Sequence, residues 1–370
     1  MRIFFLASVH SLHLWHMLTY FRDRGHEVFC FSDHPSSHNR KRSYRSVPER
    51  PLPEGIGYFF KIGPQLSRSR YIINIPRLRK IISEVKPDIV VARSLIGYGM
   101  LARYSRFKPY VLIGTGPDVN NLPNGSLLRI ALTRKIIVNA DCVWLYGAHL
   151  REIVGKLFPS IKNRLFNQPR GIDLNKFSYK NSCKKKVSTI LCTRGFMSVY
   201  NQATLIKAFS ILISKYPDIK LVLVGEGRTQ KRCKRLAENL NLDGKIKWLG
   251  YVPQEKIVEI MKGVQLFVSV SLSDGVPASL LEAMAMGLFP VVSDIPANRQ
   301  WIQDGINGYL VPATDERALA DALARAIESP SFRQKSREIN ISLMKEKADF
   351  NKNMEIIEKL FVSVVEKRNQ

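Results

Sequence analysis

The sequence has 370 residues, of which 45% are hydrophobic, so it is long enough for two folded domains and too apolar for a disordered chain. Its 57 Lys and Arg against 31 Asp and Glu give a net charge of +26, which favours an anionic partner: nucleic acid, anionic lipid or a phosphorylated substrate. The five cysteines are scattered, which excludes a disulfide framework, and no apolar run of the sequence approaches the about 20 residues that cross a bilayer.

Apolar runs and amphipathic segments alternate along the first half of the chain, a pattern typical of α/β domains with parallel sheets. The segment Pro169–Phe177 closes this half. Predicted strands cover Arg2–Ala7, Glu27–Ser32, Asp88–Ala92, Tyr110–Ile113 and Cys142–Tyr146, and predicted helices cover Leu12–Arg24 and Leu127–Asn139.

Two segments of the first half, Arg40–Arg50 and Arg68–Lys80, are basic and partly apolar. In the second of them, apolar residues at rough helical spacing alternate with cations, which predicts an interfacial segment for anionic lipid. A solvated helix that covers the first sheet explains the same spacing, and Pro76 argues against one straight helix. The apolar residues are Tyr71, Ile72, Ile75, Leu78 and Ile82.

The polar stretch Ser178–Lys186 contains no apolar run and is predicted to be a linker, after which the alternating pattern restarts. The last segment, Asn353–Glu366, has the apolar spacing of a helix. Predicted strands of the second half cover Val187–Cys192, Lys220–Val224, Lys245–Leu249, Gln265–Ser269, Phe289–Ser293 and Tyr309–Val311, and predicted helices include Gln202–Lys215, Arg228–Leu240 and Gln254–Met261. The predicted organisation is a first domain at 1–177, a linker at 178–186, a second domain at 187–350 and a C-terminal helix at 351–370 that packs back on the first domain.

The segment 271–293 carries the strongest chemical signal. Asp274 and Glu282 flank a turn of small residues and the first turns of an apolar helix, between two strands. Carboxylates accept hydrogen bonds from sugar hydroxyls, and a helix N-terminus attracts phosphate. Gly275 allows a ligand to come close, and Pro277 suits a first helical turn. The segment predicts a site for a phosphorylated or nucleotide-linked sugar, and the alternative is an acidic helix cap followed by a solvated glutamate.

This segment resembles the acidic motif of the retaining glycosyltransferases of family 4, usually written Glu-x-Phe-Gly-x4-Glu-Ala-Met-Ala-x-Gly-x-Pro-Val. Asp274 stands in place of the first Glu, which indicates a subgroup of that family. The resemblance runs from Met1 to about Phe361 and is strongest over 187–312. It implies an α/β fold of GT-B architecture, with two Rossmann-like, doubly wound domains that face a central cleft.

The resemblance also implies roles for single residues. Asp274 would hold a hydroxyl of the donor sugar, Glu282 would bind the ribose hydroxyls, and Arg194 would grip the diphosphate with its planar guanidinium. Tyr251 would stack on the base or pack internally, and both options stay open. The implied nucleotide-sugar contacts are Arg194, Tyr200, Asn201, Gly225, Glu226, Tyr251, Val252, Gly275, Val276, Pro277, Ser279, Leu280 and Glu282, and the implied catalytic residues are Asp118, Asp274 and Arg194.

Two positions depart from the family pattern. The family usually has a second diphosphate-binding cation about five residues after the Arg, but position 199 is Val, so Tyr200 and Asn201 are expected to supply neutral hydrogen bonds. In the first half, Gly114–Asp118 resembles a His-Gly-x-Asp segment with Thr115 in place of His. Asp118 would orient the acceptor hydroxyl or act as a base, unless it only forms the turn.

The histidines of the first helix do not form a metal-ligand pattern with Cys or carboxylates, so no metal site is predicted. His13 and Thr115 are assigned instead to the acceptor side. No cofactor is expected besides a UDP- or GDP-linked sugar as co-substrate.

These features predict a retaining, hexosyl-type glycosyltransferase that acts on a lipid-linked saccharide, glycolipid or other glycan acceptor in envelope polysaccharide assembly. The basic surface predicts a cytoplasmic protein held peripherally on the anionic inner face of the membrane. Recognisable nucleic-acid modules are absent from the sequence, so no nucleic-acid partner is expected. The alternatives are a nucleotide-sugar epimerase of the same fold, a non-catalytic sugar-binding subunit, and a nucleic-acid-binding protein suggested by the charge alone.

Overall fold

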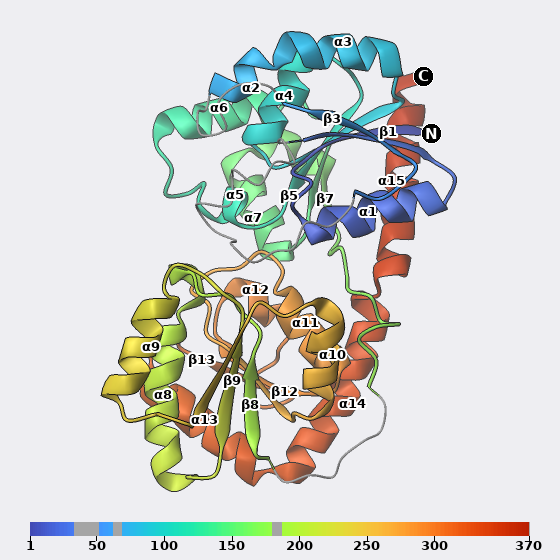
Figure 1. Ribbon diagram of the computed structural model, residues 1–370. Helices are drawn as coiled ribbons and strands as arrows, with labels where there is room; N and C mark the ends of the chain where they lie inside the picture. The colour runs from blue at the N-terminus through green and yellow to red at the C-terminus, as the bar shows by residue number, and fades with distance from the viewer. Residues whose placement is uncertain (33–51, 62–68, 180–186, 370) are drawn as a thin grey trace. The chain divides into compact units, whose positions relative to one another are not determined.

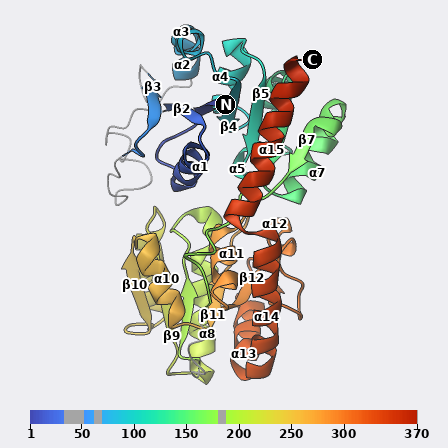
Figure 2. The ribbon, with the colours of Figure 1, turned by 90° about the vertical axis from the view of Figure 1, so that its right-hand side faces the viewer.

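The computed structural model describes residues 1–32, 52–61, 69–179 and 187–369. Within these ranges the chain divides into two units, the first made of 1–32, 52–61, 69–170 and 352–369, and the second of 171–179 and 187–351. Each unit is built on a parallel β-sheet with helices on its faces (Figures 1 and 2). The basic segment Arg40–Arg50 and most of the predicted linker lie outside the described residues.

The described strands of the first unit form one seven-stranded sheet in the order β3-β2-β1-β4-β5-β6-β7. The order reverses between β1 and β4, so the switch point of this sheet lies there. The strands are β1 Arg2–Leu6, β2 Glu27–Ser32, β3 Ile56–Phe60, β4 Ile89–Arg93, β5 Tyr110–Gly114, β6 Cys142–Leu145 and β7 Leu165–Asn167. The five predicted strands are confirmed, but the two edge strands, β3 and β7, were missed because one is only half-buried along its length and the other is very short.

Helices of the first unit cover both faces of this sheet. Side chains of α3, α4 and α6 share one apolar cluster with β1, β4 and β5, whereas α1 and α15 lie together on the opposite face (Figure 2). The helices are α1 Leu12–Asp23, α2 Ser69–Ile73, α3 Ile75–Val85, α4 Gly97–Ser105, α5 Pro117–Asn120, α6 Leu127–Ile137, α7 Ala148–Leu157 and α15 Phe350–Asn369.

The basic segment that follows Arg68 forms two short helices, α2 and α3, and Pro76 lies in the first turn of α3, where a missing N–H costs nothing. Of its apolar residues, Leu78 and Ile82 are buried, and Tyr71 and Ile75 pack against the same cluster. The helical spacing therefore belongs mainly to the face that covers the sheet, which was the alternative for this segment, and the expectation that Tyr71 and Ile75 insert into lipid is wrong.

From Lys352 onward the last helix, α15, belongs to the first unit, although it follows the second unit in the chain. Its Phe361 ring stacks on Phe21 of α1, with ring centroids 5.4 Å apart, and meets the edge of Trp144 of β6 at 6.4 Å. All three side chains are fully buried. The helix thus completes the core on the α1 face of the first sheet.

A polar cluster fixes the same helix at Glu358. Its carboxylate accepts hydrogen bonds from Nε2 of His26 at 2.7 Å, from the Tyr20 hydroxyl at 3.2 Å and from Nε of Arg24 at 3.3 Å. Burial raises the pKa of this carboxyl, but the His26 hydrogen bond and the Arg24 charge outweigh burial, and the pKa lies below its usual value. The cluster therefore stabilises the docked helix above the pKa of an unfolded glutamate, and this contribution is lost as the pH falls through the folded-state pKa.

The described strands of the second unit form one six-stranded parallel sheet in the order β10-β9-β8-β11-β12-β13, with its switch point between β8 and β11. The predicted strands of this half are confirmed: β8 Thr189–Cys192, β9 Lys220–Val224, β10 Ile246–Gly250, β11 Leu266–Ser269, β12 Phe289–Ser293 and β13 Tyr309–Val311. Its helices are α8 Gln202–Lys215, α9 Gln230–Asn239, α10 Gln254–Lys262, α11 Ala278–Ala285, α12 Pro296–Arg299, α13 Glu316–Glu328 and α14 Pro330–Lys347.

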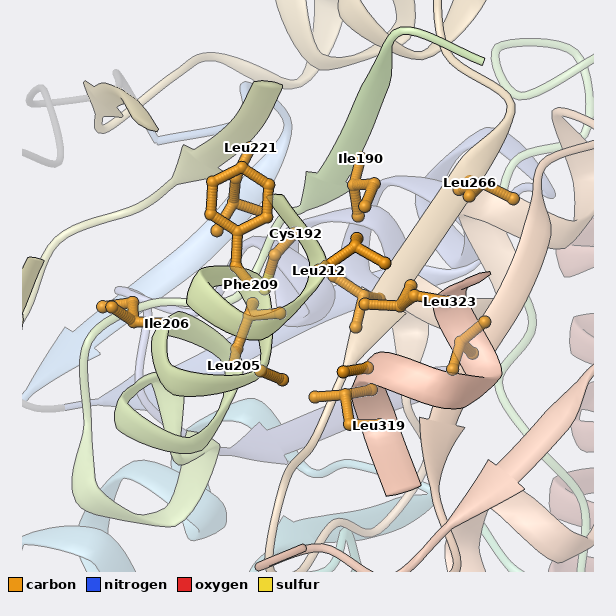
Figure 3. Close-up of a cluster of buried hydrophobic side chains, with 14 of the residues drawn as sticks. Ile190, Cys192, Leu205, Ile206, Phe209, Leu212, Leu221, Leu266, Leu319 and Leu323 are labelled. Atoms are coloured by element: carbon orange, nitrogen blue, oxygen red, sulfur yellow. The ribbon is translucent and has the colours of Figure 1, made fainter. Parts of the chain in front are cut away.

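Side chains from β8, β9, β11, α8 and α13 interlock on one face of this sheet, as Figure 3 shows around Phe209 and Leu323. A second cluster covers the other face and includes Ile172 and Phe177. The backbone N–H of Phe350 also donates to the Ile172 carbonyl at 3.0 Å. The segment 171–177 thus belongs to the second unit, whereas the sequence had placed it at the end of the first domain.

Candidate functional site

Polar residues of the second unit gather at the switch point of its sheet. Arg194 follows β8, and Asp274 lies in the loop between β11 and α11. Because β8 and β11 are hydrogen-bonded neighbours, the loops at their carboxyl ends lie close together. In open α/β sheets ligands bind at this position.

Arg194 and Asp274 form an ion pair, and only 12% and 16% of their side chains are exposed. Nη1 of Arg194 also donates to the Ser279 hydroxyl at 3.3 Å, and its guanidinium lies 4.2 Å from the centre of the Tyr200 ring. Its Nε is buried without a hydrogen-bond partner among the described residues. The structure thus brings together four predicted site residues: Arg194, Asp274, Ser279 and Tyr200. The sequence had assigned Arg194 to the diphosphate and Asp274 to the donor sugar, and the structure shows a direct contact between these two side chains.

Gln202, at the start of α8, holds the arginine loop in place. Its Nε2 donates to the carbonyl oxygens of Arg194 at 2.9 Å and of Gly195 at 2.8 Å. The side chain is only 2% exposed. Sequence reasoning missed this residue, although a glutamine that opens an otherwise apolar helix was a usable signal.

The glycine turn 225–227 packs directly against the same loop. The Phe196 N–H donates to the Glu226 carbonyl at 3.0 Å, and the Gly225 N–H donates to the Gly250 carbonyl. Oε1 of Glu226 accepts the Tyr251 N–H at 3.3 Å. The turn therefore links the loops that follow β8, β9 and β10, and the Glu226 side chain supports the segment at Tyr251.

Glu282 lies on α11, and Nε2 of Gln254 donates to its Oε1 at 3.4 Å. The carboxylate is half-buried, and the same helix begins just after the acidic turn. Among the other predicted contacts on this side, the Leu280 side chain is in the core, and Val252 and Val276 pack against that core. A contribution of Leu280 to a site would therefore come from its backbone.

Asn201 has a left-handed backbone with φ of 52°. Its Nδ2 donates to the Ala313 carbonyl at 2.7 Å, and its Oδ1 accepts the Thr204 hydroxyl at 3.2 Å. Both ends of the amide therefore hold the turn before α8. A direct contact from this side chain to a diphosphate, as the sequence analysis expected, would require these bonds to break.

In the first unit, Asp118 ties two loops together. Its carboxylate accepts the backbone N–H groups of Leu95, Thr115 and Gly116, each at 3.1 Å. Burial raises the pKa of this carboxyl, although the three N–H donors oppose the rise. This geometry favours the turn-forming alternative for Asp118 over a base that faces an acceptor.

We expect Asp118→Asn to lower the stability of the first unit by about 1–3 kcal/mol, because the amide NH2 would face an N–H group that has lost its acceptor. Scanning calorimetry of the whole chain measures this loss. Asp88→Asn is the matched control, since this exposed carboxylate accepts one backbone N–H, from Arg2. Lost turnover with an unchanged melting profile would identify Asp118 as a catalytic base instead.

His13 lies near the start of α1, and its Nδ1 accepts a hydrogen bond from Nη2 of Arg170 at 2.9 Å. A guanidinium can only donate, so Nδ1 is the unprotonated ring nitrogen in this contact. Arg170 is 7% exposed and was not singled out in the sequence. Among the described residues, no group of three or more His, Cys, Asp or Glu side chains is placed to hold a metal ion.

The two halves of the chain match two family models. The model "Glycosyl transferases group 1" matches residues 175–342, and the model "Glycosyl transferase 4-like" matches residues 2–145. Both sheets, including the residues at their switch points, lie largely within these matches.

Curated relatives match parts of the chain. An uncharacterized glycosyltransferase of Methanocaldococcus jannaschii is 24% identical over 59% of this chain and 58% of its own length. A phosphatidyl-myo-inositol mannosyltransferase of Mycolicibacterium smegmatis is 27% identical over 45% and 43%, and an amylovoran biosynthesis glycosyltransferase of Erwinia amylovora is 28% identical over 42% and 40%. The match thus spans less than two thirds of each relative.

Solved structures resemble the whole chain. A sucrose-phosphate synthase from Thermosynechococcus elongatus gives a TM-score of 0.83 at 16% identity and covers 98% of this chain and 99% of its own. HepE of Anabaena, solved with UDP and glucose, gives 0.78 at 18% identity, with 97% and 99% covered. At these identities the likeness concerns the fold alone: two Rossmann-like domains of the GT-B class.

Proposed function

We propose that this chain, a two-domain glycosyltransferase of the GT-B fold, transfers a sugar from a nucleoside diphosphate donor, with retention at the anomeric carbon. The acceptor in this proposal is a lipid-linked saccharide or glycolipid, and the donor is linked to UDP or GDP. The observation that carries the proposal is the largely buried pair of Arg194 and Asp274 at the switch point of the second sheet, next to Ser279 and Glu282 on α11. Structural relatives solved with UDP or UDP-glucose support a nucleotide-sugar donor.

In the proposed reaction, positive charge meets the leaving diphosphate at Arg194 and at the amino end of α11. The guanidinium offers several N–H groups, so it can bind a phosphate oxygen while it keeps its contact with Asp274. Asp274 would then be held where a sugar hydroxyl can donate to it. The leaving phosphate accepts the acceptor proton on the same face of the sugar, so the proposal requires no separate base and no metal ion.

The position of Asp274 gives a reason for the shorter acid. Its carboxylate is fixed by Arg194 and accepts the backbone N–H of Gly275 at 2.8 Å. We propose that this pairing defines a subgroup in which one acid both orients the diphosphate-binding arginine and selects the donor sugar. A longer glutamate would shift the guanidinium from the position that Ser279 and Tyr200 also fix.

The experiment that tests the donor assignment is a thermal-shift screen against UDP, GDP and their sugars, repeated with Glu282→Ala. Binding to the folded state raises the melting temperature by mass action. If Glu282 accepts both ribose hydroxyls, its loss weakens the nucleotide by about 1.5–3 kcal/mol, or roughly tenfold to a hundredfold in Kd.

Glu255→Ala is the matched control, because this glutamate is exposed and lies beside Gln254 at the start of α10. Calorimetry should show nearly wild-type affinity for the control. Unchanged affinity of a folded Glu282→Ala variant would remove Glu282 from the site, and the failure of every nucleotide in the screen would overturn the proposed donor class.

Peripheral attachment to the cytoplasmic face of a membrane is part of the proposal, and the net charge of +26 supports it. Among the described residues, no helix has the length and apolarity to cross a bilayer. Because Tyr71 and Ile75 pack against the core, the segment at α2 and α3 keeps only Ile72 and Ile73 well exposed for lipid contact.

A further inference from the structure

We propose that the first turns of α6 are an apolar anchor that inserts into an anionic lipid bilayer. This anchor consists of Leu127, Leu128 and Leu132, with the cations Arg134 and Lys135 beside it. The inference rests on the proposed function, because it names the surface through which the enzyme would reach a lipid-linked acceptor. In this inference the α6 leucines make the lipid contact that the sequence had suggested for Tyr71 and Ile75, which pack against the core.

The exposure of the three leucines is the first observation. Leu127 is 86% exposed, Leu128 is 70% exposed and Leu132 is 41% exposed. Single exposed apolar residues are common on protein surfaces, but adjacent ones that point into water from one helical face indicate an interaction site. The opposite face of α6 is packed in the ordinary way, because Thr133, Ile136 and Ile137 are buried.

The turn that carries the leucines is preorganised. The Ser126 hydroxyl accepts the Arg129 N–H at 3.3 Å and so caps the amino end of α6. The Thr133 hydroxyl donates to the Arg129 carbonyl, and α6 packs against α4 beneath it. The leucines are therefore held in the exposed position by an ordered helix, and no rearrangement is needed to present them.

The charges around the leucines decide between possible partners. Arg134 and Lys135 are exposed about two helical turns after Leu127 and Leu128. The sequence from Val119 to Ala140 contains no Asp or Glu. A second copy of this chain would bring two positive faces together, which is unfavourable. An anionic bilayer offers both an apolar interior for the leucines and phosphate groups for the cations, as interfacial helices require.

Neighbouring helices extend the same surface. Helix α4 packs against both α2 and α6, so the three share one side of the first sheet (Figure 1). On α2, Ile72 is 62% exposed and Ile73 is 49% exposed, and on α4 Tyr104 is 38% exposed with Arg103 next to it. Leu127 and Leu128 are more exposed than the apolar side chains of α2 and α4, so they should contribute most of the salt-resistant binding of this face.

The test is vesicle flotation of the full chain with three double variants. Leu127→Gln/Leu128→Gln removes the anchor, Arg134→Gln/Lys135→Gln removes the adjacent charge, and Ile211→Gln/Ile339→Gln is the control. The control side chains are exposed on α8 and α14 of the second unit, at 42% and 43%. Vesicles of phosphatidylcholine alone and vesicles that also contain phosphatidylglycerol are compared at low and high salt.

We expect wild type and control to bind the anionic vesicles and to keep a bound fraction at high salt. The leucine variant should lose roughly tenfold or more in partition coefficient, with the salt-resistant fraction gone, and the charge variant should lose binding mainly at low salt. Wild-type partitioning of the leucine variant would overturn the proposal. The proposal would also be overturned if wild type formed a dimer, the leucine variant were monomeric, and both bound vesicles equally. The partner of the leucines would then be a second copy of this chain.

A separate readout distinguishes this inference from the proposed function. The melting shift with UDP or GDP is measured without vesicles in all variants and should equal that of wild type, which also shows that the leucine variant is folded. If wild type shows no nucleotide shift, the donor assignment fails, but the vesicle result still decides whether α6 is a membrane anchor.

Discussion

Replacement of Arg194 by alanine is expected to remove most of the affinity for a nucleoside diphosphate while it leaves the affinity for the free nucleoside nearly unchanged. The guanidinium of Arg194 is a largely buried cation at the switch point of the second sheet. Position 199, where a second cation is usual in the family that the sequence resembles, is valine. A charge-assisted hydrogen bond contributes about 1.5–3 kcal/mol, so the Kd for the diphosphate should rise roughly tenfold to a hundredfold. Calorimetric titration with UDP, GDP and their nucleosides measures the difference.

The control for this experiment is Arg299→Ala. Arg299 pairs with Asp294 in the same unit through a hydrogen bond and its charge, and this partner keeps the pKa of Asp294 below its usual value. The pair is exposed and screened by solvent, so its loss should have little effect on stability and none on diphosphate affinity. Equal losses for diphosphate and nucleoside in Arg194→Ala would show that this arginine does not touch phosphate.

Gly227→Ala is expected to destabilise the second unit by about 3 kcal/mol or more, which exceeds the usual effect of a surface substitution. A Cβ at this position would lie 2.1 Å from the Phe196 carbonyl oxygen and 2.5 Å from its carbon. These are backbone atoms and cannot rotate away. The turn would have to move from the loop that carries Arg194, so nucleotide affinity should fall together with stability.

Gly263→Ala provides the comparison, because the nearest atom to its Cβ would be the Ile260 carbonyl oxygen at an ordinary 3.8 Å. Its stability should be unchanged or slightly higher, since alanine restricts the unfolded chain. Calorimetric unfolding of both variants measures the contrast. Similar melting of the two variants would mean that the turn at Gly227 relaxes freely and does not hold the arginine loop.

The sequence predicted both sheets because central parallel strands are short apolar runs separated by helical spacing, and that pattern is local. It missed β3, which lies at an edge and is half-buried throughout. It also read the spacing of Tyr71 and Ile75 as a lipid-facing stripe, because periodicity shows that a helix has an apolar face but not which way that face points. The residue spacing in α6 predicted no apolar face of this kind, and the exposure of its leucines to solvent became evident only from the structure.

The candidate site was predictable residue by residue but not as an arrangement. Arg194 and Asp274 were identified from separate motifs, and their ion pair depends on the adjacency of β8 and β11, which no local pattern encodes. Gln202 was missed because its role is to bind two backbone carbonyls of a distant loop. Asp118 was assigned to chemistry, yet its three backbone N–H donors indicate a structural role.

The return of α15 to the first unit has a consequence for how the chain is made. The second unit is continuous in sequence among the described residues, so it can fold as soon as it has left the ribosome. The first unit cannot: Phe21 and Trp144 stay without Phe361 until the entire second unit has been synthesised. The core on the α1 face of the first sheet therefore stays incomplete while the second unit is being made, which leaves apolar side chains for chaperones to bind during this interval.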